Sequence, residues 1–142
     1  MGALAVAAAL SAGVGVRAAA GAAPRLPLFA GCSSSAPTLR PRSILVACGD
    51  GNFFTTGLTW SRWGITDAVA AGTGHQNDCT PDCARGRFRL YPVDVRLWRP
   101  ETCVDGRREF TRFSYRFVGN KPAGVVRGDT LKSPFYRGAG CP

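Results

Sequence analysis

The stretch EFTRFSYRF, residues 109–117, decides the fold class that the sequence predicts. Its residue types alternate along the chain, and from Phe113 onward a large aromatic side chain stands at every second position. A period of two places successive side chains on opposite faces of a β-strand, so one face of this segment is predicted to be buried. The buried face would carry Thr111, Phe113, Tyr115 and Phe117, and the solvent face Arg112, Ser114 and Arg116.

The segment before it, RFRLYPVDVRLW at residues 87–98, alternates in the same way with one interruption. The interruption falls at Tyr91-Pro92. Because proline has no N–H to give to a strand ladder, we expect a β-bulge or a corner at this point. Before the interruption one face would carry Phe88 and Leu90, and after it Val93, Val95 and Leu97 would continue that face one position out of phase.

Turn signals separate these strands from further ones. Asp105-Gly106 is typical of a hairpin turn that would connect the two segments above. Earlier in the chain, GDGN at 49–52 predicts a tight turn between the apolar run 44–48 and a strand at 53–60. Gly57 is a candidate β-bulge within that strand.

Taken together, the segments predict an all-β domain. Residues 67–75 are small and form a strand that another layer could approach closely, while Trp60 and Trp63 offer the largest side chains for a core. No segment shows a convincing 3.6-residue period. We therefore predict a small antiparallel β-sandwich or barrel of about six strands, stapled by disulfides, within residues 43–117.

The regions outside that domain differ in composition. Residues 1–31 are rich in alanine and glycine and contain an apolar run at 2–16, which is typical of a secretory signal segment. Small-residue cleavage positions follow at 18–23. Residues 32–42 are interpreted as a linker, and residues 118–142 as an irregular C-terminal tail. The protein is expected to be secreted or exposed at the cell surface. In an alternative interpretation, LFAGCSSSAP is a lipidation signal and Cys32 carries a lipid anchor.

Six cysteines in an exported domain of this size indicate disulfides. Cys48 is expected to pair with Cys79 or Cys83, because an up-and-down strand order brings the loop NDCTPDCARG, residues 77–86, back to the first turn. Cys103 would then take the remaining loop cysteine. Cys32 and Cys141 flank the domain and would tie its ends together, unless Cys32 is lipidated.

The same loop offers ligands for a metal ion. His75, Cys79 and Cys83 are spaced by four residues, and Cys48 or Asp82 would complete a zinc site. Disulfides are the favoured interpretation in an oxidising compartment, so neither a metal nor another cofactor is predicted. Asn77 or Asp78 is expected to cap the loop with its side chain.

The charge balance is basic, with 18 Lys and Arg against 9 Asp and Glu. Four arginines precede residue 43, which leaves 14 basic and 9 acidic residues in the rest of the chain, a net charge of +5. No basic helical stripe and no aromatic RNA-binding signature accompanies this charge, so nucleic acid is not an expected partner. Attraction to an anionic cell-wall polymer fits better.

Four motifs in this order resemble a family of small exported actinobacterial proteins of unknown function: ACGDGN, LTWSRWG, NDCTPDCARG and YPVDV. The resemblance covers roughly residues 43–117. It implies secretion and a disulfide-bonded domain, and it brings no known activity. YPVDV and GRREFTRF also resemble, more weakly, the Streptomyces subtilisin-inhibitor family, which implies a cysteine-bearing loop beside a β-rich domain.

The sequence favours an exported, non-catalytic domain that binds an extracellular protein or a cell-envelope ligand. One alternative is a secreted serine-protease inhibitor that presents residues 80–88, with Arg85 or Arg87 as its specificity residue. A small hydrolase is the other alternative, although the only histidine, His75, follows no catalytic motif, and no catalytic residue is predicted. The candidate interaction loop consists of Asp78, Thr80, Asp82, Arg85 and Arg87.

Overall fold

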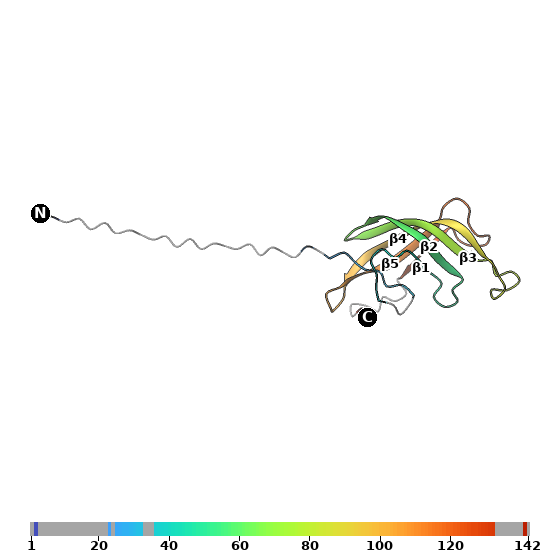
Figure 1. Cartoon of the computed structure of the whole chain (residues 1–142), viewed down its shortest axis with the longest axis horizontal. Helices are drawn as coiled ribbons and strands as arrows, with labels where there is room; N and C mark the ends of the chain where they lie inside the picture. The colour runs from blue at the N-terminus through green and yellow to red at the C-terminus, as the bar shows by residue number, and fades with distance from the viewer. Residues whose placement is uncertain (1, 3–22, 24, 33–35, 133–140, 142) are drawn as a thin grey trace.

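The computed structural model describes residues 2, 23, 25–32, 36–132 and 141. Its strands are antiparallel to their neighbours and follow one another in chain order across a single six-stranded sheet, which curls into a half-barrel (Figure 1). The predicted all-β antiparallel class is confirmed. The strands are β1 (Ile44–Leu45), β2 (Phe53–Trp63), β3 (Asp67–Asn77), β4 (Phe88–Thr102), β5 (Arg108–Phe117) and β6 (Gly128–Lys132). In the described part of the chain, no helix is long and apolar enough to cross a membrane.

The inner face of the sheet carries the hydrophobic core, as the alternation in β5 predicts. Thr111, Phe113 and Phe117 are buried, and Tyr115 packs against the core from its edge. The hairpin turn at Asp105-Gly106 is also present, with Cys103 N–H donating to the Arg107 carbonyl. The buried cluster consists of Phe29, Ile44, Leu58, Trp63, Ala68, Ala70, Val95, Leu97, Phe110 and Phe113.

The expected bulge or corner at Tyr91-Pro92 is wrong. β3 and β4 pair without a register shift from Asp67↔Trp98 to Asn77↔Phe88. In a strand, the N and C=O of one residue point toward the same neighbour, and the Pro92 carbonyl accepts from Val118 N–H just past the end of β5. The missing N–H of Pro92 therefore faces a place where the ladder has already ended. Phe88 and Leu90 are exposed on the outer face instead of sharing the core face.

The expected bulge at Gly57 is confirmed. The register between β2 and β3 shifts between Thr56 and Thr59, and Gly57 has a φ of 62°. The small residues of β3 permit a close approach, although not by another layer as was expected. A Cβ on Gly74 would lie 3.2 Å from the Phe53 ring and 3.4 Å from the Phe117 ring. The approaching groups are aromatic side chains of the same sheet.

The ranges predicted as a leader, 1–31, and a linker, 32–42, include residues that pack against the sheet. Residues 25–32 and 36–47, here called the N-terminal segment, cross the open side of the half-barrel (Figure 1). Leu28 forms a parallel bridge with Glu109 in β5, and Phe29 is 3% exposed within the core. Trp63 Nε1–H donates to the carbonyl of buried Pro27 at 2.9 Å. The cleavage positions expected at 18–22 lie outside the described residues.

The predicted irregular tail is also corrected. β6 pairs with β5 from Arg112↔Lys132 to Arg116↔Gly128, so residues 128–132 belong to the sheet. Cys141 is bonded to Cys103. The sequence of this region is rich in glycine and proline, and its strand shows no alternation long enough to detect. Residues 133–140 and 142 lie outside the described part.

Trp63 is the main tryptophan of the core, and Trp60 packs against its edge. Trp63 is 7% exposed, and its ring meets Trp60 at 4.5 Å and Phe110 at 5.6 Å in edge-on contacts. Trp60 is only partly buried, and its Nε1–H donates to the Pro41 carbonyl at 2.8 Å. The core role expected for Trp60 thus belongs more fully to Trp63.

Candidate functional site

The six cysteines form three disulfides, which pair differently from the prediction: Cys32–Cys48, Cys79–Cys83 and Cys103–Cys141. The cysteine loop does return to the first turn, because Asn77 N–H donates to the Asn52 carbonyl. Cys48 is nevertheless bonded to Cys32, since the N-terminal segment runs beside it. The same bridge uses the Cys32 sulfur that lipidation would require. Cys103 lies beyond β4, at the strand end opposite the loop, and bonds to Cys141.

Asn77 holds the cysteine loop from the end of β3. It is 7% exposed, and its Oδ1 accepts from Cys79 N–H at 3.0 Å. Its Nδ2 donates to the Cys83 carbonyl and to Asn52 Oδ1, both at 2.8 Å. Gly86 is required opposite it, because a Cβ there would collide with the Asn77 side chain. The predicted capping role of Asn77 is confirmed, and the loop is fixed at its base.

Asp78 closes the loop on the other side. Its Oδ1 accepts from Arg87 N–H at 2.9 Å and from Thr80 N–H at 3.2 Å, and its Oδ2 accepts from Arg89 Nε at 3.0 Å. The hydrogen bond from the Arg87 amide, supported by those from Thr80 and Arg89, holds the pKa of Asp78 below its usual range. The carboxylate therefore stays ionised and is poorly suited to donate a proton in catalysis.

The outer part of the loop is a tight turn. Arg85 N–H donates to the Asp82 carbonyl at 3.2 Å and to its Oδ1 at 3.0 Å, and the Arg85 guanidinium pairs with the Asp82 carboxylate. Arg85 and Arg87 are exposed. Arg85 thus lies in a folded turn and is already paired with an acid.

A pocket of about 490 Å³ lies between the cysteine loop and the chain after β5, and we call it the loop pocket. Arg89 and Tyr91 reach it from β4, and Tyr91 packs edge-on against Phe117 at 5.6 Å. Of the predicted interaction loop, only Asp78 and Thr80 line it. The lining residues are Gln76, Asn77, Asp78, Thr80, Arg89, Tyr91, Pro122, Ala123 and Val125.

The prediction missed most of this pocket for two reasons. The slip assumed at Tyr91-Pro92 placed the odd-numbered residues before it, including Arg89 and Tyr91, on the outer face. The region after residue 117 was expected to be irregular, yet its buried Pro122 forms one wall. Unbroken alternation from Arg89 to Leu97 was the available signal for the inner side of β4.

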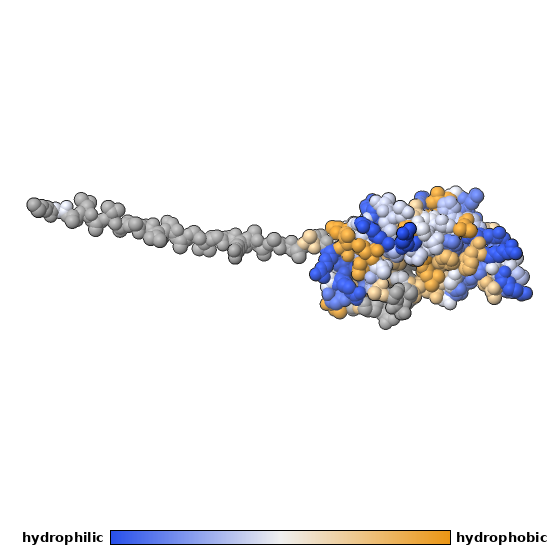
Figure 2. Space-filling view, in the orientation of Figure 1, coloured by the Kyte–Doolittle hydropathy of each residue, from blue (hydrophilic) through white to orange (hydrophobic). Residues whose placement is uncertain are grey.

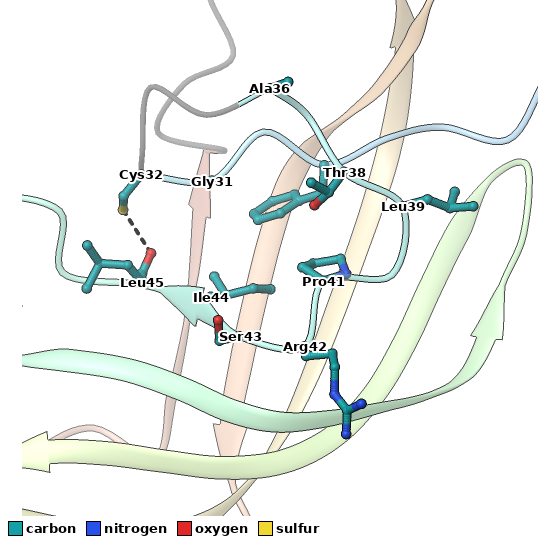
Figure 3. A pocket seen from close by; sticks show the side chains of 11 residues that line it. Gly31, Cys32, Ala36, Thr38, Leu39, Pro41, Arg42, Ser43, Ile44 and Leu45 are labelled. Atoms are coloured by element: carbon teal, nitrogen blue, oxygen red, sulfur yellow. Dashed lines mark hydrogen bonds between the residues drawn. The ribbon is translucent and has the colours of Figure 1, made fainter.

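Another hollow, of about 510 Å³, lies within the N-terminal segment, whose residues line it (Figure 3). Its wall is made by Phe29, Pro41, Ile44 and neighbouring residues, and Figure 3 shows the Arg42 side chain pointing away from it. Among the described lining residues, the polar side chains other than Arg42 are the hydroxyls of Thr38 and Ser43 and the bonded Cys32. These groups do not form a nucleophile–base pair.

His75 lies apart from both hollows, on the outer face of β3. Its Nε2 is 2.8 Å from Thr56 Oγ1, and its ring stacks on Phe54 with centroids 4.5 Å apart. Within the described residues, His75 has no hydrogen bond or ion pair to an acid. The ligands of the less favoured zinc interpretation are not free to assemble around it, because Cys79 and Cys83 are bonded to each other.

Exposed apolar residues lie among hydrophilic ones on the surface. On the face seen in Figure 2, apolar areas are interrupted by hydrophilic ones. The apolar side chains exposed around the domain come from different elements, for example Ile65, Leu90, Val104 and Val126. The loop pocket combines an ion pair with an aromatic residue of the inner face beside a disulfide-bonded loop, and we take it as the candidate site.

Glu109 is an acid in the core, and neither of its carboxylate oxygens accepts a hydrogen bond from the described part of the chain. It is 0% exposed, and Arg107 Nη1 lies 3.9 Å from Oε1. Burial raises the pKa of Glu109 above its usual range; the charge of Arg107 offsets part of that rise, and Asp105 adds to it. The ionised form is therefore disfavoured in the folded chain.

Glu109→Gln is expected to stabilise the protein at neutral pH. With a raised pKa, the folded chain keeps a proton that the unfolded chain has lost, so the contribution of Glu109 to stability is full below the unfolded pKa and declines as the pH rises through the folded pKa. Removing the charge should add about 1–3 kcal/mol to the free energy of unfolding at neutral pH. Urea unfolding at several pH values tests this prediction. The difference in the free energy of unfolding between Glu109→Gln and the unsubstituted chain should increase from acid to neutral pH. A difference that decreases over this range would contradict the prediction.

No protein-family model, curated protein or solved structure matches this chain.

Proposed function

We propose that this chain is an exported, non-catalytic binding domain whose loop pocket receives a hydroxyl-rich segment of a cell-envelope glycan. The observation that carries the proposal is that the Asp78–Arg89 ion pair and Tyr91 line the same pocket, of about 490 Å³. That size is within the range of small-molecule sites. The three disulfides are consistent with an extracellular location.

The polar groups of the loop pocket suit a polyhydroxyl ligand. The Asp78 carboxylate accepts hydrogen bonds, and the Arg89 guanidinium, which is bound to Asp78 through Nε, has further N–H donors on a side chain that is 58% exposed. Gln76 adds an amide at the same rim. The Tyr91 ring offers an apolar face on which the C–H side of a sugar ring can pack.

The site is also rigid before a ligand arrives. The Cys79–Cys83 disulfide, the Asn77 hydrogen bonds and the Asp78 hydrogen bonds to backbone amides fix one wall of the loop pocket. The other side is built from strand β4. A preorganised site loses little conformational entropy on binding, which favours recognition of a weakly held polymer repeat.

The two alternatives receive less support. A serine-protease inhibitor presents an extended, exposed segment to the protease cleft, whereas Arg85 lies in a turn and is paired with Asp82. For a small hydrolase, His75 contacts Thr56 on the outer face and is stacked on Phe54, away from the loop pocket. The ionised Asp78 favours binding over acid catalysis.

Arg89→Ala is expected to weaken binding to insoluble cell-wall glycan by about 10- to 100-fold, because hydrogen bonds to a charged group contribute about 1.5–3 kcal/mol. Asp78 keeps its bonds from the Arg87 and Thr80 amides, so the loop should stay folded. Cosedimentation of the purified chain with isolated cell-wall sacculi, over a range of glycan concentrations, measures the change.

Arg116→Ala is the matched control. Arg116 is exposed and pairs with Asp94 at 2.9 Å on the outer face of the sheet, so the substitution removes the same charge from a similar ion pair away from the loop pocket. It should change the affinity by less than about twofold. Equal losses in both variants would mean that net charge alone attracts the polymer, and the loop-pocket proposal would be wrong. Absence of binding by the unsubstituted chain would also overturn it.

A further inference from the structure

Three metal-ligating side chains meet at the end of the sheet opposite the cysteine loop. Cys103 follows β4, Glu109 belongs to β5, and Cys141 comes from the C-terminal end of the chain. The two sulfur atoms and a carboxylate oxygen of Glu109 lie within 4.8 Å of one another. All three residues are buried, at 3%, 0% and 9% exposure for Cys103, Glu109 and Cys141. This cluster is separate from the loop pocket.

In the disulfide-bonded form, the described residues donate no hydrogen bond to the Glu109 carboxylate. A disulfide carries no charge and no proton to donate. A carboxyl group in such a place costs more than an apolar side chain of similar volume. Packing and cross-linking alone therefore do not account for an acid at this position.

We propose that Cys103, Glu109 and Cys141 form a binding site for one Zn²⁺ ion when the two cysteines are thiols. Zinc binds thiolate sulfur and carboxylate oxygen in protein sites. Two thiolates and one carboxylate carry three negative charges, of which Zn²⁺ balances two; the Arg107 guanidinium, 3.9 Å from Glu109, adds a positive charge that it shares with Asp105. The carboxylate, which receives no hydrogen bond from the described residues of the oxidised chain, becomes a metal ligand in the reduced one.

The hairpin between β4 and β5 preorganises two of the ligands. Cys103 N–H donates to the Arg107 carbonyl at 2.8 Å, and Gly106 N–H donates to the Cys103 carbonyl at 2.9 Å. Glu109 pairs with Glu101 in the strand register directly above that turn. Cys103 and Glu109 are thus held together by local structure. Cys141 completes the set, with its Cα 5.1 Å from that of Cys103.

The disulfide and the zinc site exclude each other. A phosphine cleaves the S–S bond, and its phosphorus is oxidised to a phosphine oxide with oxygen from water, whose two protons go to the two sulfurs. Zinc then displaces both thiol protons to solvent. Zinc binding is therefore confined to the reduced chain and should protect these two cysteines from reoxidation and alkylation.

The experiment uses the full chain, reduced with a phosphine and freed of it without oxygen. One equivalent of Zn²⁺ is added, iodoacetamide is applied, and the rate of alkylation at each cysteine is read by mass spectrometry. We expect Cys103 and Cys141 to be alkylated at least about tenfold more slowly with zinc than without it, while Cys32, Cys48, Cys79 and Cys83 change little. Zinc analysis should give one ion per reduced chain.

Glu109→Gln should weaken zinc binding by at least about tenfold, since even residues that only orient metal ligands contribute that much. Glu101→Gln removes the same charge on the neighbouring strand, outside the cluster, and should leave the affinity unchanged. Protection spread over all six cysteines, protection of the loop pair Cys79 and Cys83, or unchanged affinity in Glu109→Gln would each overturn the proposal. If the reduced chain unfolds, zinc can bind any of its thiols, and the protection would then be spread over all six cysteines.

Discussion

Replacing Trp63 by alanine is expected to lower the free energy of unfolding by about 3–5 kcal/mol, a large share of the stability of a domain of this size. The indole fills the inner face of the sheet between Trp60 and Phe110. Its Nε1–H also donates to Pro27, so the substitution loosens the N-terminal segment as well. Urea unfolding followed by circular dichroism measures the change without depending on the fluorophore that is lost.

Trp98→Ala is the matched control. Trp98 lies on the outer face of β4, partly exposed, with the Arg96 guanidinium 5.5 Å from its ring. Its removal should cost clearly less than the loss of Trp63, about 1–2 kcal/mol, because the ring lies outside the core and one cation–π contact with an exposed arginine is lost. Equal costs for the two tryptophans would mean that the core does not lie on the inner face as described.

Removing the Cys103–Cys141 disulfide by a double substitution to serine should lower the free energy of unfolding by about 4 kcal/mol, as loop-closure entropy predicts for cysteines 38 residues apart. This bridge ties the C-terminal end of the chain to the hairpin between β4 and β5. Differential scanning calorimetry of the oxidised chains measures the difference. Double substitution avoids leaving one thiol without its partner.

The corresponding double substitution of Cys79 and Cys83, which are 4 residues apart, should cost about 2 kcal/mol by the same relation. The Asn77 and Asp78 hydrogen bonds hold the base of that loop without the bridge. If removing the Cys79–Cys83 disulfide lowers the free energy of unfolding more than removing Cys103–Cys141 does, the disulfides stabilise the protein through local native contacts more than through the entropy of the unfolded chain.

Several features of the fold could be predicted from the sequence alone, because each depends on residues that are close together in the chain. The alternation in residues 109–117 placed Phe113 and Phe117 on the buried face of β5. Gly57, GDGN and Asp105-Gly106 predicted a bulge and two turns from backbone conformations that glycine adopts readily. Asn77 or Asp78 was expected to cap the cysteine loop from its place before the first cysteine, and Asn77 accepts from Cys79 N–H. The all-β class followed from these local signals.

Other features were decided only by the tertiary structure. Proline at position 92 is harmless because its nitrogen faces the end of the β5 ladder, which depends on where another strand stops. Phe29 and Pro27 enter the core from a segment without periodic sequence, since single side chains fill the open side of the half-barrel. The disulfide partners follow from that same crossing, which brings Cys32 beside Cys48. The loop pocket likewise needs β4 and the chain around Pro122 to meet. Such contacts join residues that are far apart in the sequence, and a local sequence pattern does not show which distant residues will meet.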